Sequence, residues 1–287
     1  MRNIKPPLPF VGHKGHWGSE LTEIARNLPP ETIVFDVFGG SGICAHYIKQ
    51  ARPDLEVVWN DFDNYRARLS HAPETERLRL YFLENLGRPA RKGEFIQPLP
   101  PERRQFVFDA LNRHLADFGF VDYRTISNWF YLYLSKSQKL FSHTGILYNR
   151  VSLSPIRLDA CAGWLKNVCA SSVKFSGTDT PFALPSRIVR PRDFIPEQNA
   201  LLVFDPPYLG TTCNDYSAKD ALFVLRSIVE CCEQLPFLLF GDSSIAFWYE
   251  ALFKNRRVVK YEKVIKSIGL NHVQRTEVLF ACLPGDG

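Results

Sequence analysis

The chain has 287 residues, of which 45% are hydrophobic and 23% charged, and its formal net charge is +5. This length suits one large α/β domain or a core domain with a smaller insert, and the composition is typical of a globular protein. No apolar run approaches the roughly 20 residues that span a bilayer, and the N-terminus lacks an apolar signal-peptide core. We therefore expect a cytoplasmic protein without membrane contact, whose mild basicity permits nucleic-acid binding.

Cysteine usage and histidine spacing give two further expectations. The seven cysteines are odd in number and scattered, which fits reduced thiols better than a disulfide framework. No Cys/His cluster has the spacing of a zinc site, so the sequence predicts no metal.

The N-terminal segment over residues 6–18 mixes glycine and proline with basic and aromatic residues, so it cannot form a regular helix or strand. Its glycines let backbone N–H groups approach a ligand, and Lys14 could pair with a carboxylate. A loosely ordered terminus is the alternative, but the bulky side chains of Phe10 and Trp17 favour burial. A short helix is predicted over residues 19–28.

Residues 32–61 predict one nucleoside-binding half of an α/β sheet. An apolar strand leads into a glycine-rich turn at 39–42, and a helix over 43–50 and a strand over 56–60 follow. The second strand ends at Asp61, about 20 residues after the glycines, where a carboxylate typically binds ribose hydroxyls. The glycine spacing is not the dinucleotide fingerprint, and no phosphate-binding loop is present.

The middle of the chain changes character from about residue 66 to 172. It is rich in arginine, and helices are predicted over 102–118 and 125–141, followed by a polar and basic turn. We expect a mainly helical insert that grips DNA phosphates and reads bases, whereas a solvated helical face is a fair alternative for any one arginine. The candidate DNA-binding residues are Arg124, Tyr148, Asn149 and Arg150.

Three further strands are predicted to follow the insert, over 172–179, 201–204 and 236–242, with helices over 220–233 and 245–253. Two terminal strands, over 257–264 and 276–282, complete the chain. Asp179, which ends the predicted strand over 172–179, could accept a hydrogen bond from an adenine amino group of a cofactor. The alternative for Asp179 is a cap or turn role.

The segment Asp205-Pro206-Pro207-Tyr208 follows four apolar residues that read as a buried strand of a parallel sheet. The prolines end that strand, which leaves Asp205 at its carboxyl end, where open α/β sheets carry their ligand sites. Asp205 and the Pro206 carbonyl could accept two N–H bonds from a flat amino-bearing ring, on which Tyr208 would stack. The alternative is a helix cap at Asp205 and ordinary packing of Tyr208.

In this order, the motifs resemble those of the DNA adenine methylase family, the N6-adenine methyltransferases of the Dam or D12 class. The matching segments are Asp36-Val37-Phe38-Gly39-Gly40-Ser41-Gly42, Asn60-Asp61-Phe62-Asp63, Asp205-Pro206-Pro207-Tyr208 and Arg275-Thr276-Glu277-Val278-Leu279. The opening around Pro9-Phe10 and Lys14 departs from the family pattern, and Asp36 stands where the family has glutamate.

The resemblance implies a Rossmann-like S-adenosylmethionine-dependent methyltransferase sheet, formed by residues 1–65 and 173–287, with a mainly helical target-recognition insert at 66–172. It implies methyl transfer to adenine N6 of a base flipped out of double-stranded DNA. The expected cofactor contacts are Phe10, Lys14, Asp36, Phe38, Gly40, Gly42, Asp61 and Asp179, and the expected catalytic residues are Asp205, Pro206, Pro207 and Tyr208. We expect a monomer in a bacterium or a phage-infected cell, serving DNA protection or regulation.

Three alternatives remain open at the level of sequence. An N4-cytosine DNA methyltransferase uses the same two acceptors, so only the modified base separates it from an adenine enzyme. A catalytically silent DNA-binding relative would keep the fold, although the intact Asp205 to Tyr208 motif argues against it. An RNA or protein-glutamine methyltransferase is also conceivable, but the large insert before the reactive strand favours DNA.

Overall fold

A computed structural model describes residues 4–10, 12–61, 63–87, 97–130, 147–148, 153–169, 199–206, 225–226, 228–266 and 274–285. The chain divides into two compact units, here called unit 1 (Met1–Ile4, Lys14–Asp63 and Asn167–Gly287) and unit 2 (Lys5–His13 and Asn64–Lys166). The N-terminal stretch 5–13 therefore belongs with the helical unit, whereas the sequence placed it in the catalytic domain. Within the described ranges, no helix is long and apolar enough to cross a membrane.

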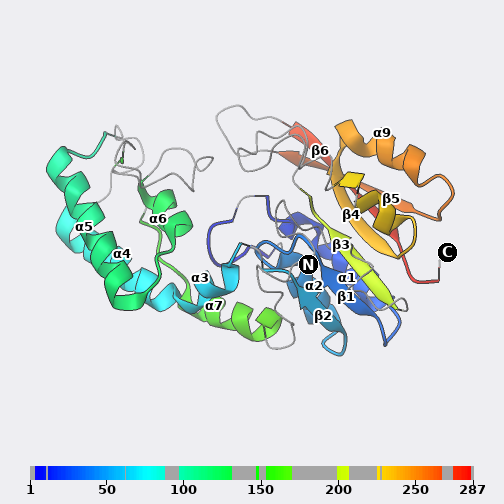
Figure 1. Cartoon of the computed structure of the whole chain (residues 1–287), viewed down its shortest axis with the longest axis horizontal. Helices are drawn as coiled ribbons and strands as arrows, with labels where there is room; N and C mark the ends of the chain where they lie inside the picture. Colours follow the sequence, from blue (N-terminus) through cyan, green and yellow to red (C-terminus); the bar gives the residue numbers. More distant parts are fainter. Residues whose placement is uncertain are drawn as a thin grey trace. The chain divides into compact units, whose positions relative to one another are not determined.

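Unit 1 is built on a sheet whose described part has six strands (Figure 1). The strand order is β2-β1-β3-β4-β6-β5, with parallel pairs from β2 to β4 and antiparallel pairs on both sides of β6. The bounds are β1 Ile33–Asp36, β2 Glu56–Trp59, β3 Ala200–Phe204, β4 Phe237–Asp242, β5 Val259–Lys266 and β6 Gln274–Cys282. The predicted Rossmann-like α/β class is confirmed.

The position of each strand in the sheet follows from its residues. β3 and the apolar part of β4 are buried along their length, as expected of central parallel strands that are covered on both faces. At the edge, β5 carries charged residues, and Val264 is 64% exposed. Charges of this kind discourage pairing of an edge strand with another chain.

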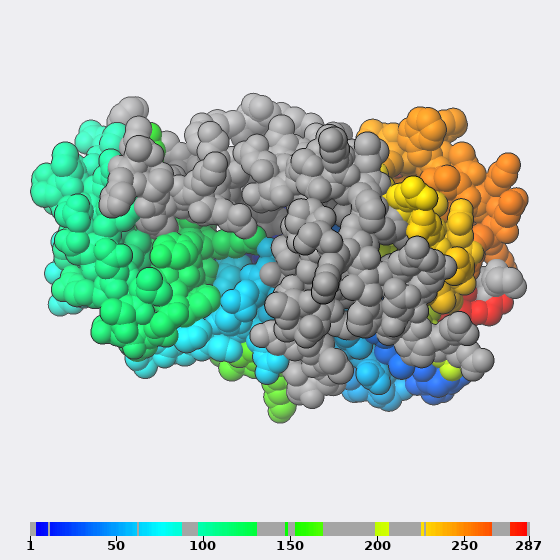
Figure 2. All heavy atoms as spheres, in the orientation of Figure 1, coloured from blue at the N-terminus to red at the C-terminus, as the bar shows by residue number. Residues whose placement is uncertain are grey.

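The helical elements of unit 1 whose bounds are described include η1 Gly15–Trp17, α1 Gly18–Arg26, α2 Ile43–Ala51 and α9 Ser243–Leu252. Of the helix predicted over 220–233, the described residues 225–226 and 228–232 are helical. α1 packs on α2, which also contacts β1 and β2, and α9 packs on β4 and β6. Asp242 begins α9 as its N-cap, because its carboxylate accepts the N–H of Ser244. α9 lies at the surface in Figure 2, where it is orange, and it exposes Phe247 and Trp248.

Unit 2 is mainly helical in its described part. Its helices are α3 Tyr65–Ser70, α4 Ala72–Leu86, α5 Pro101–Phe118, α6 Tyr123–Phe130 and α7 Leu158–Trp164, after which a π-helical turn, η3 Leu165–Cys169, leads into unit 1. The helix predicted over 102–118 is confirmed as α5. The helix predicted from residue 125 begins at Tyr123 instead, and its part after residue 130 lies outside the described residues.

The N-terminal stretch of unit 2 is fixed by hydrogen bonds to α3. The Leu8 N–H donates to Tyr65 Oη at 3.0 Å, and Tyr65 Oη lies 3.1 Å from the Leu8 carbonyl, to which it donates. Arg68 Nη2 donates to the Pro9 carbonyl at 2.9 Å, and the Phe10 ring packs edge-on against Tyr65. The loosely ordered terminus considered as an alternative is therefore excluded for these residues.

Candidate functional site

The order of the strands creates a topological switch point beside β1. The chain passes from β1 to its neighbour β2 and later returns to the other side of β1 as β3. Ligands of open α/β sheets bind outside the carboxyl ends of the strands at such a point. Asp36 is the last residue of β1, and Asp205 directly follows β3, so both carboxylates lie where the topology predicts a ligand.

Asp205 forms an ion pair with Lys14, whose Nζ lies 2.7 Å from Asp205 Oδ1. The Lys14 side chain is only 3% exposed, whereas that of Asp205 is 21% exposed. Lys14 also lies over the Phe240 ring, with Nζ 5.6 Å from the ring centroid. The ammonium is therefore enclosed on the side of the sheet, while part of the Asp205 carboxylate remains accessible to a second partner.

Burial and neighbouring charges act together on these carboxylates. Burial raises the pKa of Asp205, Lys14 and His16 act to lower it, and the like charge of Glu277 raises it further. The pKa of Asp36 is raised to about 7, mainly by burial and secondarily by the charge of Asp205, against a hydrogen bond that acts to lower it. We call Asp36, Asp205 and Glu277 the carboxylate cluster, in which Lys14 pairs with Asp205 and His16 with Glu277.

Asp36 has a structural partner inside unit 1. Its Oδ2 accepts the backbone N–H of Ala45, the third residue of α2, at 3.2 Å. Gly42 occupies the N-cap position of α2 and has no side chain to bond a free N–H of the first turn. Asp36 therefore supplies from β1 the acceptor that the N-cap lacks, and its 2% exposure leaves little of it for a ligand.

The turn between β1 and α2 requires glycine for two different reasons. Gly42 has φ +71°, in the left-handed region, and its N–H donates to the Gly39 carbonyl at 2.6 Å. A Cβ added to Gly39 would lie 2.1 Å from Trp59 Cδ1. The turn is thus packed tightly against the last residue of β2. Gly40 of the same turn also has a positive φ, +47°.

The end of β2 presents buried polar groups. Asn60 Nδ2 donates to the Val37 carbonyl at 2.9 Å, whereas Asn60 Oδ1 is buried and, among the described residues, has no hydrogen-bond partner. Asp61 follows it and is 7% exposed. A buried acceptor without a donor is costly unless a ligand supplies one. This acceptor and the adjacent carboxylate fit the hydroxyl donors of a ribose.

Sequence reasoning missed the network around Glu277. The Glu277 side chain is fully buried, and its Oε2 lies 2.8 Å from His16 Nε2 and 3.3 Å from Trp17 Nε1. The sequence did contain a signal, because Glu277 immediately precedes the buried run from Val278 to Cys282. A carboxylate at such a position needs specific partners.

The structure also describes the surroundings of three further predicted residues. Phe38 is half-buried, with its ring centroid 6.4 Å from that of Phe204. The Arg124 guanidinium lies 5.6 Å from the Phe10 ring centroid within unit 2. Tyr148 donates its backbone N–H to the carbonyl of Phe130 at 2.7 Å.

Of the remaining predicted site residues, one is described by the structure and five are not. Pro206, the second expected acceptor, is buried directly after Asp205. The residues Asn149, Arg150, Asp179, Pro207 and Tyr208 lie outside the described residues. Their expected roles stay predictions.

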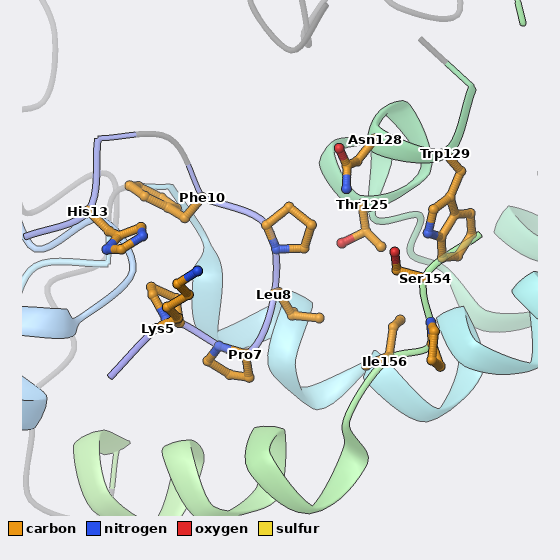
Figure 3. A pocket seen from close by; sticks show the side chains of 13 residues that line it. Lys5, Pro7, Leu8, Phe10, His13, Thr125, Asn128, Trp129, Ser154 and Ile156 are labelled. Carbon is orange, nitrogen blue, oxygen red and sulfur yellow. The ribbon is translucent and has the colours of Figure 1, made fainter. Parts of the chain in front are cut away.

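Unit 2 contains a cavity of about 260 Å³ (Figure 3). One side is formed by the N-terminal stretch, including Lys5 and Phe10, and another by Asn128 and Trp129 of α6. Ser154 and Ile156 complete the lining. The lining combines proline and aromatic surfaces with amide and hydroxyl groups and includes a lysine but no carboxylate.

Comparison with known proteins adds one relative. The chain is 30% identical over 256 residues to a protein of Haemophilus influenzae (strain ATCC 51907 / DSM 11121 / KW20 / Rd) named "Putative methyltransferase". The similarity covers 84% of this chain and 77% of that protein. No family model matches the chain.

Proposed function

This chain belongs to the methyltransferase family of that relative, and from this premise we propose that it methylates adenine N6 in double-stranded DNA with S-adenosylmethionine as donor. The observation that carries the proposal is the position of Asp205. It directly follows a central parallel strand at the topological switch point, is ion-paired on one side and is accessible on the other. This is the arrangement needed by a carboxylate that receives an N–H group of a substrate.

Asp205 and the Pro206 carbonyl would act on the amino group of the base. The lone pair of an exocyclic amine is delocalised into its ring, which makes the nitrogen a poor nucleophile. Two fixed acceptors for its N–H groups favour a pyramidal nitrogen and aim its lone pair, so that much of the rate gain comes from positioning. Tyr208, which lies outside the described residues, would hold the flipped base by stacking.

The proton balance of the transfer also involves Asp205. When S-adenosylmethionine is bound, it supplies a methyl carbon whose bond to sulfur breaks as the bond to nitrogen forms. The amino nitrogen then loses one proton, which Asp205 can accept. Because burial raises its pKa, Asp205 is a stronger base than an exposed aspartate, while Lys14 keeps it from being protonated too readily.

Asp61 and Asn60 are the residues that would hold the ribose of the cofactor. Asn60 Oδ1 offers a buried acceptor for which the described residues provide no donor, and the Asp61 carboxylate can accept hydroxyl hydrogens. The glycines at 39–42 let a nucleoside approach the backbone closely. The other expected contacts, including Asp179, remain part of this proposal.

Two features support DNA as the methyl acceptor: the net positive charge of the chain and the lining of the cavity in unit 2. The chain carries a net charge of +5, and the cavity of unit 2 has a lysine but no carboxylate in its lining. An anionic backbone therefore meets no like charge there. Arg124, with Tyr148, Asn149 and Arg150, would provide contacts that weaken as salt is added.

The test is to incubate the purified protein with unmethylated genomic DNA and methyl-labelled S-adenosylmethionine, and to identify the labelled nucleosides by mass spectrometry. We expect N6-methyladenine, and none with Asp205→Asn. Detection of N4-methylcytosine would show that the methylated base is cytosine and not adenine. Absence of label in DNA, with the cofactor still bound, would contradict the proposal and point to RNA, a protein or a silent relative.

A further inference from the structure

Glu277 connects the last strand of the sheet with the N-terminal segment of unit 1. An ionised carboxylate only accepts hydrogen bonds, so His16 Nε2 and Trp17 Nε1 both donate to its Oε2. The partners are 261 and 260 residues away in sequence, and Trp17 is fully buried like Glu277 itself. β6 thus holds η1 by two hydrogen bonds.

Lys263 adds a second attachment from β5. It is the cross-strand partner of Glu277, and its Nζ donates to the His16 carbonyl at 2.7 Å and to Glu20 Oε2 at 2.6 Å. The same ammonium lies 5.0 Å from the centroid of the Trp17 ring. The two terminal strands therefore contact both the backbone and the side chains of η1.

The residue immediately before η1 is Lys14, the ion-pair partner of Asp205. Tyr47 of α2 donates its hydroxyl to the Gly15 carbonyl at 2.9 Å, which fixes the backbone next to Lys14 from a further side. The Trp17 N–H donates to the Lys14 carbonyl at 2.9 Å, so the turn of η1 includes Lys14 itself. A displacement of η1 would consequently move the lysine backbone.

We propose that Glu277 is a positioning residue, which acts through η1 to place the Lys14 ammonium against Asp205. This inference rests on the proposed function in one respect, namely that Asp205 receives the reacting amine. Glu277 itself does not touch the substrate in this scheme. Its contribution is to fix the geometry and the protonation of the residue that does.

The charge of Glu277 and its positioning role affect Asp205 in opposite directions. As a nearby like charge, Glu277 favours protonation of Asp205, whereas by holding Lys14 in place it favours ionisation. The other charged or titratable groups that act with Asp205 are Lys14, His16 and Asp36. The direction in which the pKa of Asp205 changes on mutation therefore separates the two roles.

The experiment follows the carboxyl carbon of Asp205 by NMR during a pH titration of the full chain without cofactor, with aspartate carboxyls labelled with ¹³C. The signal is assigned by its loss in Asp205→Asn. In Glu277→Ala we expect the pKa of Asp205 to rise toward its value in Lys14→Met, because η1 is released. A fall, or no change, in Glu277→Ala would show that Glu277 is merely a nearby charge.

Two further variants serve as rescue and control. Glu277→Gln keeps an acceptor oxygen for the ring N–H groups and removes the charge, so the pKa of Asp205 should not rise. Glu262→Gln removes an exposed carboxylate from β5, at the position before Lys263, and should leave the titration unchanged.

A variant without any change of charge covers the case in which Glu277→Ala does not fold. Trp17→Phe keeps an aromatic ring and removes only the N–H donor to Glu277. A rise in the pKa of Asp205 supports the positioning role, and an unchanged value overturns it.

Methyl transfer gives the second readout. In Glu277→Ala we expect kcat on DNA to fall by about 100-fold, as for a misplacement of about 1 Å, with KM for DNA within about threefold of the wild type. If the wild-type protein does not methylate adenine, the proposed function fails, whereas the titration without cofactor still decides whether Glu277 positions Lys14.

Discussion

Units 1 and 2 each bury an ion pair, but the two pairs differ in what surrounds them. In unit 2, Arg68 Nε lies 2.9 Å from Asp122 Oδ1, and the side chains are 4% and 1% exposed. Asp122 also accepts the N–H and the hydroxyl of Thr125, at 3.1 and 2.6 Å, and thereby caps α6. In unit 1, the carboxylate of the pair is 21% exposed.

The surroundings of the two carboxylates distinguish a structural ion pair from a functional one. Asp122 has its oxygens occupied by protein donors, and one cation balances one anion. Asp205 keeps an accessible part, and the carboxylate of Glu277 adds a like charge near its pair with Lys14. A partly accessible carboxylate with a like charge beside it, at a strand end, is typical of a binding or catalytic site, whereas a buried carboxylate whose oxygens are occupied by protein donors specifies packing.

Removing the carboxylate of unit 1 should give the largest effect. Asp205→Asn keeps an oxygen that can accept from Lys14, but it removes the charge and the base. We expect kcat for methyl transfer to fall by about 1,000-fold or more, because both alignment and proton acceptance are lost. Calorimetric titration with S-adenosylmethionine should still detect binding. Transfer at the wild-type rate, or a loss of cofactor binding that accounts for the lower rate, would contradict the role given to Asp205.

Breaking the pair of unit 2 should affect folding instead. Arg68→Met leaves Asp122 buried without its cation, and we expect the free energy of unfolding to fall by about 3–5 kcal/mol. Urea denaturation of the full chain measures the change. The double variant Arg68→Met/Asp122→Asn removes the uncompensated charge and should recover part of the loss. A single-variant loss below about 1 kcal/mol would mean that this pair is not enclosed as described.

Asp61 should affect cofactor affinity more than turnover. Asp61→Ala removes a carboxylate acceptor, and a hydrogen bond to a charged group contributes about 1.5–3 kcal/mol, so we expect the Kd for S-adenosylmethionine to rise at least about tenfold. Asp54→Ala is the matched control, because Asp54 is an exposed aspartate shortly before β2 that pairs with Arg52. An equal Kd for Asp61→Ala and the wild type would refute the proposed contact between Asp61 and the ribose.

Asp36 gives an effect of a different kind, a pH dependence of stability. Its pKa is about 7 in the folded protein against a usual value of 3.8, so between these values the folded state binds the proton more tightly. Raising the pH through this window therefore lowers the contribution of Asp36 to stability, by at most about 1.4 kcal/mol per pH unit. Asp36→Asn keeps an acceptor for the Ala45 N–H and should lose this slope in urea denaturation at pH values across the window. An unchanged slope would refute the raised pKa.

Much of unit 1 could be predicted from sequence because its elements have simple periodicity. Buried strands such as β3 and β4 are unbroken apolar runs, α1 carries one apolar face, and α2 is buried along most of its length. The helices of unit 2 were harder to predict from the sequence. The buried face of α4 includes Arg79, which is neutralised by Glu76 at 2.6 Å and donates to the Leu153 carbonyl at 3.1 Å. A charged residue on a buried face hides the helical pattern, so α4 was not predicted.

The α/β class, the strand that ends at Asp205 and the acidic end of β2 could be predicted from the sequence, because they depend on local runs of apolar residues, glycines and prolines. Which charges meet depends on the tertiary fold. Lys14 and Asp205 are separated by 191 positions in the numbering, and His16 and Glu277 by 261. Strand order and burial bring such groups together, and neither can be read from spacing along the chain. The same is true of Asp36, which the structure bonds to α2 because Gly42 cannot cap that helix.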